Sequence, residues 1–125
     1  MKEDENFSRH AEGSRPLRVL FVCTGNVDRS RTAQEMYEGI EGLEVRSAGT
    51  SIAAVVPLTR ELIRWADKIF VMEPKHQRAV LRMDASAEKR TICLGIPDEY
   101  YHGQRELKLL LAEKLQPYLK FKPKI

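Results

Sequence analysis

The sequence is poor in cysteine and contains no long apolar segment. Its two cysteines, Cys23 and Cys93, are too few for a disulfide framework and too sparse for a zinc site. No apolar run approaches the roughly 20 residues that a membrane-spanning helix needs, and the polar start of the chain lacks the pattern of a secretory signal. We therefore expect a cytoplasmic protein without a membrane partner.

Histidine and charge of one sign are also scarce. The three histidines have no metal-ligand spacing, and we expect His76 on an exposed helix face and His102 in a loop. The net charge is only +3, and Lys and Arg alternate with Asp and Glu instead of forming a basic stripe. This balance suits anionic substrates. We expect no nucleic-acid partner and no metal or other cofactor, and the oligomeric state stays open.

The apolar residues that are present suffice for one domain. The chain has 125 residues, of which 42% are hydrophobic. Residues 1–16 lack hydrophobic periodicity, and we expect them to form a flexible amino-terminal tail. We expect residues 17–120 to form a single α/β domain and residues 121–125 to be a frayed basic end.

Short apolar runs alternate with helical patterns along this domain. The predicted strands are Leu17–Cys23, Leu43–Ser47, Lys68–Met72 and Arg90–Leu94. The predicted helices are Arg29–Ile40, Thr59–Ala66, Pro74–Met83 and Gln104–Leu119. The alternation predicts a Rossmann-like, three-layer α/β/α fold, with a four-stranded parallel sheet and helices on both faces. Such sheets bind ligands beyond the carboxyl ends of their strands.

The segment that follows the first strand has the composition of an anion-binding loop. Gly25 and Asn26 tolerate positive φ angles, so the loop can curl with consecutive N–H groups facing inward. These donors and the start of the next helix form a cradle for an anion. Arg29 can bind two oxygens of a tetrahedral oxyanion, and Ser30 can donate a hydrogen bond to the thiolate of Cys23.

A thiolate beneath a bound phosphate can attack phosphorus in line and form a cysteinyl phosphate. The leaving oxygen then needs a general acid, and Asp98 after the last strand is the candidate, with Glu99 as its local competitor. Tyr100 and Tyr101 could either wall the pocket or cover the last helix. The residues thus indicate cysteine-dependent phosphate chemistry.

Three motifs in this order resemble the low-molecular-weight protein tyrosine phosphatase family. That family has V-C-x-G-N-x-C-R-S-P after the first strand, S-A-G-T after the second and D-P-Y-Y near the carboxyl end. This chain has VCTGNVDRSR at Val22–Arg31, SAGT at Ser47–Thr50 and DEYY at Asp98–Tyr101. The match runs from about Leu17 to Tyr118, and the order of the motifs differs from that of the larger tyrosine phosphatases.

The resemblance implies a phosphomonoester hydrolase, namely a protein tyrosine phosphatase that acts on a phosphotyrosine protein or a small aryl phosphate. It implies Cys23 as nucleophile, Arg29 as phosphate clamp and Asp98 as general acid and base. The implied phosphate-binding residues are Thr24, Gly25, Asn26, Val27, Asp28, Arg29 and Ser30. Ser47, Tyr100 and Tyr101 are supporting residues under this hypothesis.

The chain departs from the family pattern in its loops. Asp28 stands where the family has a second loop cysteine, so a disulfide with Cys23 cannot form there. We expect the Asp28 carboxylate to point away from the thiol, paired with an arginine or capping the helix. Ser51–Leu58 carries no aromatic residue where the family places a substrate wall.

Three other functions are compatible with the pattern. An arsenate reductase would need further cysteines, and Cys93 lies in a predicted buried strand. A phosphoarginine phosphatase would have Thr where this chain has Val27. A phosphate-binding module without activity is the non-enzymatic alternative.

Overall fold

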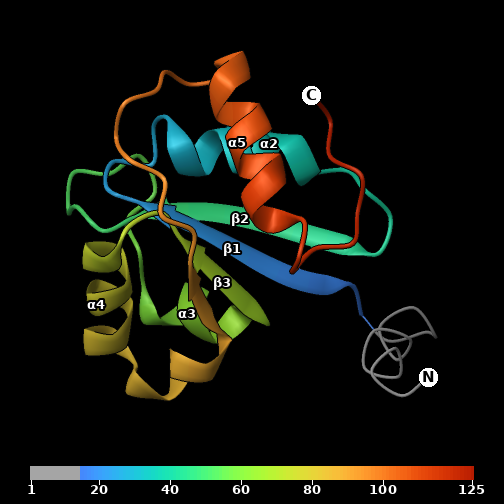
Figure 1. Cartoon of the computed structure of the whole chain (residues 1–125). Coiled ribbons are helices and arrows are strands. Elements are labelled where there is room, and N and C mark those ends of the chain that lie inside the picture. The colour runs from blue at the N-terminus through green and yellow to red at the C-terminus, as the bar shows by residue number, and fades with distance from the viewer. Residues whose placement is uncertain (1–14) are drawn as a thin grey trace.

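A computed structural model describes residues 15–125 as a parallel sheet with helices on both faces (Figure 1). The strands are β1 (Leu17–Cys23), β2 (Leu43–Gly49), β3 (Lys68–Val71) and β4 (Thr91–Cys93). Their order in the sheet is β2-β1-β3-β4, and every neighbouring pair is parallel. The predicted four-stranded α/β fold is confirmed.

Within residues 15–125, three α-helices and one short 3₁₀ helix lie between successive strands, and a fourth α-helix follows β4. They are α2 (Arg29–Tyr37), α3 (Arg60–Trp65), α4 (Pro74–Met83), the 3₁₀ helix Ala85–Arg90 and α5 (Arg105–Leu115). Helices α2 and α5 lie on one face of the sheet, and α3 and α4 lie on the other (Figure 1). None of the helices in residues 15–125 has the length and apolar character needed to cross a membrane.

Strand β1 is central and contributes to two cores. Because successive side chains of a strand point to opposite faces, Phe21 and Cys23 belong to the core under α2 and α5. Leu20 and Val22 belong to the core over α3 and α4. All four side chains are buried, which explains the continuous apolar run in the sequence. Because β1 pairs with both β2 and β3, its carboxyl end lies between these two neighbours.

Several predicted boundaries are wrong by a few residues. Helix α2 was expected to reach Ile40 but ends at Tyr37, two residues before Gly39, which has a φ of 78°. The last helix ends at Leu115 instead of Leu119. The 3₁₀ helix was not predicted, and it positions Arg90 to donate to the carbonyls of Ile63 and Ala66 at 2.7 and 2.8 Å.

The two ends of the chain were expected to be a flexible tail and a frayed basic end. Positions 1–14 of the expected tail, residues 1–16, lie outside the described residues, and Arg15 forms an ion pair with Asp67 at 2.7 Å. Residues 121–125 contain no helix or strand, but the Lys124 amide donates to the Met36 carbonyl at 2.8 Å. Phe121 packs against the core under α2 and α5.

Gly49 ends β2 where that strand passes the loop that follows β1. Its neighbours bond to this loop, because the Thr50 amide donates to the Cys23 carbonyl at 2.9 Å and the Ser51 amide to the Thr24 carbonyl at 3.0 Å. A Cβ atom on Gly49 would overlap the Thr24 carbonyl oxygen and lie 2.6 Å from the Ala54 Cβ. The glycine of the SAGT motif is thus required by the close approach of two backbones.

We expect Gly49→Ala to lower the free energy of unfolding by about 2 kcal/mol or more, because backbone must move to admit the methyl group. Gly25→Ala is the matched control, since its Cβ would meet nothing closer than 3.6 Å. Thermal and denaturant unfolding of both variants would measure the difference. Equal stabilities would contradict the close-approach explanation.

Candidate active site

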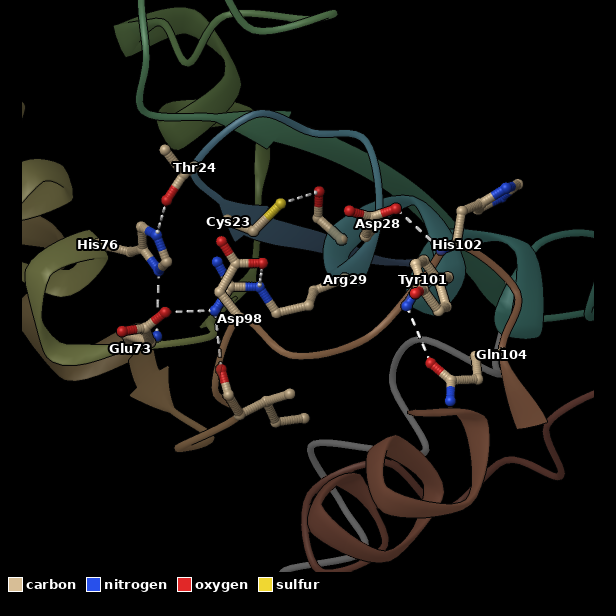
Figure 2. A network of polar contacts seen from close by, with 12 residues as sticks. Cys23, Thr24, Asp28, Arg29, Glu73, His76, Asp98, Tyr101, His102 and Gln104 are labelled. Atoms are coloured by element: carbon tan, nitrogen blue, oxygen red, sulfur yellow. Dashed lines mark hydrogen bonds and ion pairs between the residues drawn. The ribbon is translucent and has the colours of Figure 1, made fainter. Parts of the chain in front are cut away.

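The loop between β1 and α2 surrounds an open cavity of about 270 Å³ at the carboxyl edge of the sheet (Figure 2). Asn26 has a φ of 57°, a left-handed conformation that lets the loop curl as expected. The Cys23 side chain is buried at the base of this loop. The residues that line the cavity are Cys23, Gly25, Val27, Asp28, Arg29 and Asp98.

Two serines and one asparagine hold the loop from inside. The Asn26 side chain is fully buried, and its Nδ2 donates to Ser30 Oγ at 2.8 Å and to Ser47 Oγ at 2.9 Å. Ser47 in turn donates to Gln34. Ser30 Oγ lies 3.0 Å from Cys23 Sγ. Because Ser30 accepts from Asn26, its own hydroxyl proton is available to a negatively charged sulfur.

Arg29 is only 2% exposed and is fixed by groups from two segments, one after β3 and one after β4. Its Nη1 donates to the Ile96 carbonyl at 2.8 Å and to the Glu73 carboxylate. Its Nε lies 3.8 Å from Asp98 Oδ1. The hydrogen bond from Arg29 lowers the pKa of Glu73. A buried guanidinium with these partners is held at the cavity wall as a fixed positive charge.

His76 is buried, so the prediction of an exposed helix position is wrong. Its Nδ1 accepts from the Glu73 backbone N–H at 3.1 Å, which leaves Nε2 to donate to Thr24 Oγ1 at 2.8 Å (Figure 2). Burial lowers the pKa of His76 to about 4. The neutral imidazole therefore connects the start of α4 to the loop after β1.

Sequence reasoning missed the contribution of Glu73 and His76. Glu73 follows β3 at the edge of the sheet where ligands bind, but nothing in the sequence around it indicates a partner. A signal for His76 was its spacing of four residues from Val80, because both side chains lie buried on one face of α4.

Asp98 lies at the mouth of the cavity, and its side chain is 64% exposed. The neighbouring Glu99 is exposed and does not line the cavity. Tyr100 packs against the core under α2 and α5, whereas Tyr101 is 77% exposed. Neither tyrosine lines the cavity, so of the two roles considered for these residues the structure does not show that of a pocket wall.

The two cysteines lie on opposite faces of the sheet. Cys23 packs in the core under α2 and α5, and Cys93 packs against the core over α3 and α4. Both are free thiols. This separation leaves Cys93 unable to act as the second thiol of an arsenate-reductase relay with Cys23 in this fold. Among residues 15–125, no group of three or more His, Cys, Asp or Glu side chains could hold a metal ion.

Comparisons with known proteins agree with this geometry. No family model matches the sequence. The protein-arginine-phosphatase of Geobacillus stearothermophilus is 30% identical over 63% of this chain and 70% of its own length. The solved structure of YwlE arginine phosphatase from the same organism is 31% identical, with a TM-score of 0.63 over 82% of this chain and 94% of its own.

A third similar protein shares the fold. Wzb of Vibrio vulnificus, solved in complex with benzylphosphonate, is 24% identical, with a TM-score of 0.69 over 83% of this chain and 97% of its own. Together with the motifs and their placement around one cavity, these similarities show that the chain belongs to the low-molecular-weight protein tyrosine phosphatase family of cysteine-dependent phosphatases.

Proposed function

We propose that the protein hydrolyses phosphate monoesters of phenols, including phosphotyrosine, through a cysteinyl-phosphate intermediate. The observation that carries this proposal is the meeting of Cys23, Arg29 and Asp98 at one cavity, with the Ser30 hydroxyl 3.0 Å from the sulfur. These groups supply a nucleophile, a fixed positive charge and a proton donor.

The reaction has two steps. The Cys23 thiolate attacks phosphorus while the P–O bond to the leaving group breaks, and Asp98 gives its proton to the leaving oxygen. Asp98, now a carboxylate, then removes a proton from water as that water attacks phosphorus. The P–S bond breaks, which releases inorganic phosphate and restores the thiolate. Ser30 donates a hydrogen bond to the sulfur at the start and the end of the cycle.

The loop binds the phosphate in this mechanism. Backbone N–H groups of residues 24–30 and the start of α2 surround the non-bridging oxygens. Arg29 binds two of these oxygens, and the Glu73 carboxylate orients the Arg29 guanidinium by accepting a hydrogen bond from it. Asn26, Ser47 and the neutral His76 hold the loop in shape before substrate arrives.

The wall of the cavity favours an aromatic leaving group. Val27 lines the cavity and is 52% exposed, so it presents apolar surface to a bound ring. We propose phosphotyrosine proteins or small aryl phosphates as substrates, cleaved in the cytoplasm. Residues 17–120 would form the catalytic domain.

Phosphoarginine is the second candidate substrate. The similar sequence and the similar solved structure from Geobacillus stearothermophilus, at 30% and 31% identity, are those of an arginine phosphatase. Asp28 and Asp98 both line the cavity, and carboxylates accept hydrogen bonds from a guanidinium. The remaining alternative is a phosphate-binding module without turnover.

Hydrolysis of p-nitrophenyl phosphate tests the nucleophile. We expect Cys23→Ser to abolish turnover, and the matched control Cys93→Ser to retain it, because Cys93 lies on the other face of the sheet. Phosphate binding without turnover by the wild type would favour the binding module. Turnover that survives Cys23→Ser would exclude the cysteinyl-phosphate mechanism.

A poor leaving group tests the general acid. With phenyl phosphate, Asp98→Ala should lower kcat by about 100-fold, since a phenoxide leaves poorly without a proton. With p-nitrophenyl phosphate the loss should be smaller. Glu99→Ala is the control, because this carboxylate is exposed and outside the cavity. A large loss of kcat in Glu99→Ala, with little loss in Asp98→Ala, would assign the general acid to Glu99.

A substrate panel of phosphotyrosine and phosphoarginine peptides tests the role of Val27. We expect the wild type to prefer phosphotyrosine, and Val27→Thr to lower kcat/KM for phosphotyrosine by about tenfold through lost apolar contact. Val55→Thr is the control, because Val55 is exposed in the neighbouring loop without lining the cavity. A wild type that prefers phosphoarginine would overturn the aryl assignment.

The buried His76 predicts acid sensitivity of the fold. Its pKa of about 4 lies below the ordinary value of 6.5, so the unfolded chain takes up a proton first as the pH falls. The free energy of unfolding should therefore drop between pH 6.5 and 4, by about 2 kcal/mol. Denaturant unfolding at several pH values should show a shallower drop for His76→Asn. Parallel curves would contradict this role.

A further inference from the structure

We infer that Asp28 is a positioning residue that fixes the segment carrying Asp98 onto helix α2. This inference rests on the proposed function, because it assigns a purpose to holding Asp98 at the cavity. It concerns the residue that departs from the family pattern, and it follows from contacts between α2 and residues 101–104.

Three side chains bind residues 101–104: one precedes α2 directly and two belong to α2. Asp28 Oδ1 accepts from the His102 amide at 2.8 Å, and Thr32 Oγ1 accepts from the Gly103 amide at 2.9 Å. Glu35 Oε1 lies 2.8 Å from His102 Nε2. The spacing of four and then three residues places all three side chains on one face of the helix. That face therefore acts as a docking surface for residues 101–104.

The docked segment is itself a closed turn. The Tyr101 amide donates to Gln104 Oε1 at 2.9 Å, and the Gln104 amide donates to the Tyr101 carbonyl at 3.1 Å (Figure 2). Gly103 has a φ of 76°, which turns its amide toward α2 at little cost. Two hydrogen bonds therefore close the turn, and its bonds to Asp28 and Thr32 fix its position on α2.

The other end of the Asp98 segment is fixed as well. The Ile96 amide donates to the Met72 carbonyl at 2.7 Å, and the Ile96 carbonyl accepts from Arg29 Nη1 at 2.8 Å. Arg29 and Asp28 are consecutive residues, so one point of the phosphate-binding loop holds residue 96 and residue 102. The chain between them, including Asp98, spans the mouth of the cavity.

Besides these two attachments, Tyr100 holds the segment by packing against the core under α2 and α5, but little holds the side chain of Asp98 itself. Its side chain is 64% exposed, and its ion pair with Arg29 is long at 3.8 Å. Asp28 does not serve as a helix cap, since its side chain accepts no capping hydrogen bond from α2. A charged acceptor for the His102 amide is instead a strong tie between the segment and the loop.

The test compares Asp28→Ala with Asp28→Asn. Asparagine keeps an oxygen acceptor for the His102 amide but removes the charge, so it separates the tie from any electrostatic effect on Cys23. We expect Asp28→Ala to lower kcat for phenyl phosphate about tenfold more than kcat for p-nitrophenyl phosphate, because misplacement of the acid matters most for the poorer leaving group. Asp28→Asn should show the leaving-group dependence of the wild type.

A double-mutant cycle and a measurement independent of turnover complete the test. In an Asp98→Ala background, Asp28→Ala should cause no further selective loss, because the tie acts through Asp98. Hydrogen exchange of the His102 and Gly103 amides should accelerate at least several-fold in Asp28→Ala and in Thr32→Val. Glu41→Ala, an exposed carboxylate beyond the end of α2, is the control for loss of charge.

The outcomes separate this inference from the proposed function. Unchanged exchange of both amides in Asp28→Ala, or equal losses for the two leaving groups, would overturn the positioning role. A wild type without turnover would overturn the proposed function, and the exchange result would still decide whether Asp28 holds the segment. Equal effects of Asp28→Asn and Asp28→Ala would show that charge, not the tie, is what matters.

Discussion

The pairing of the buried Arg29 guanidinium organises the site and the ends of three strands. A buried positive charge is tolerated only when it is paired and hydrogen-bonded, and Arg29 finds the Glu73 carboxylate after β3 and the Ile96 carbonyl after β4. The residue itself begins α2, directly after the loop that leaves β1. One side chain thus joins three strand exits. The cavity exists where it does because these exits converge on this charge.

Much of the fold and the centre of the site could be predicted from local sequence. The apolar run Leu17–Cys23 has the composition of a strand buried on both faces, and the structure buries its last five side chains. Gly25 and Asn26 indicated a curled loop, and Asn26 does adopt a positive φ. These signals succeed because strand burial and loop curvature depend on neighbouring residues. The buried strand and the curled loop together placed Cys23 and the loop residues beside it at one site.

The missed features depend on contacts between distant parts of the chain. His76 meets Thr24 across 52 positions, and Asp28 meets His102 across 74. The sequence around Asp28 suggested an arginine partner or a helix cap, whereas its acceptor role depends on where residues 101–104 come to lie. The same holds for Tyr101, whose exposure is set by a turn that docks elsewhere on α2. Local patterns carry no information on such docking.

The residue at position 28 also bears on the redox chemistry of the site. A thiolate that is oxidised to a sulfenic acid is restored most readily when a second thiol lies beside it. In the described part of the chain, the other cysteine, Cys93, faces the opposite core, and Asp28 occupies the place where the family has a loop cysteine. A carboxylate there cannot form a disulfide, but it accepts a hydrogen bond that an uncharged thiol would accept only weakly. The Asp28 side chain therefore binds the amide of His102 at the position where the family pattern has a cysteine.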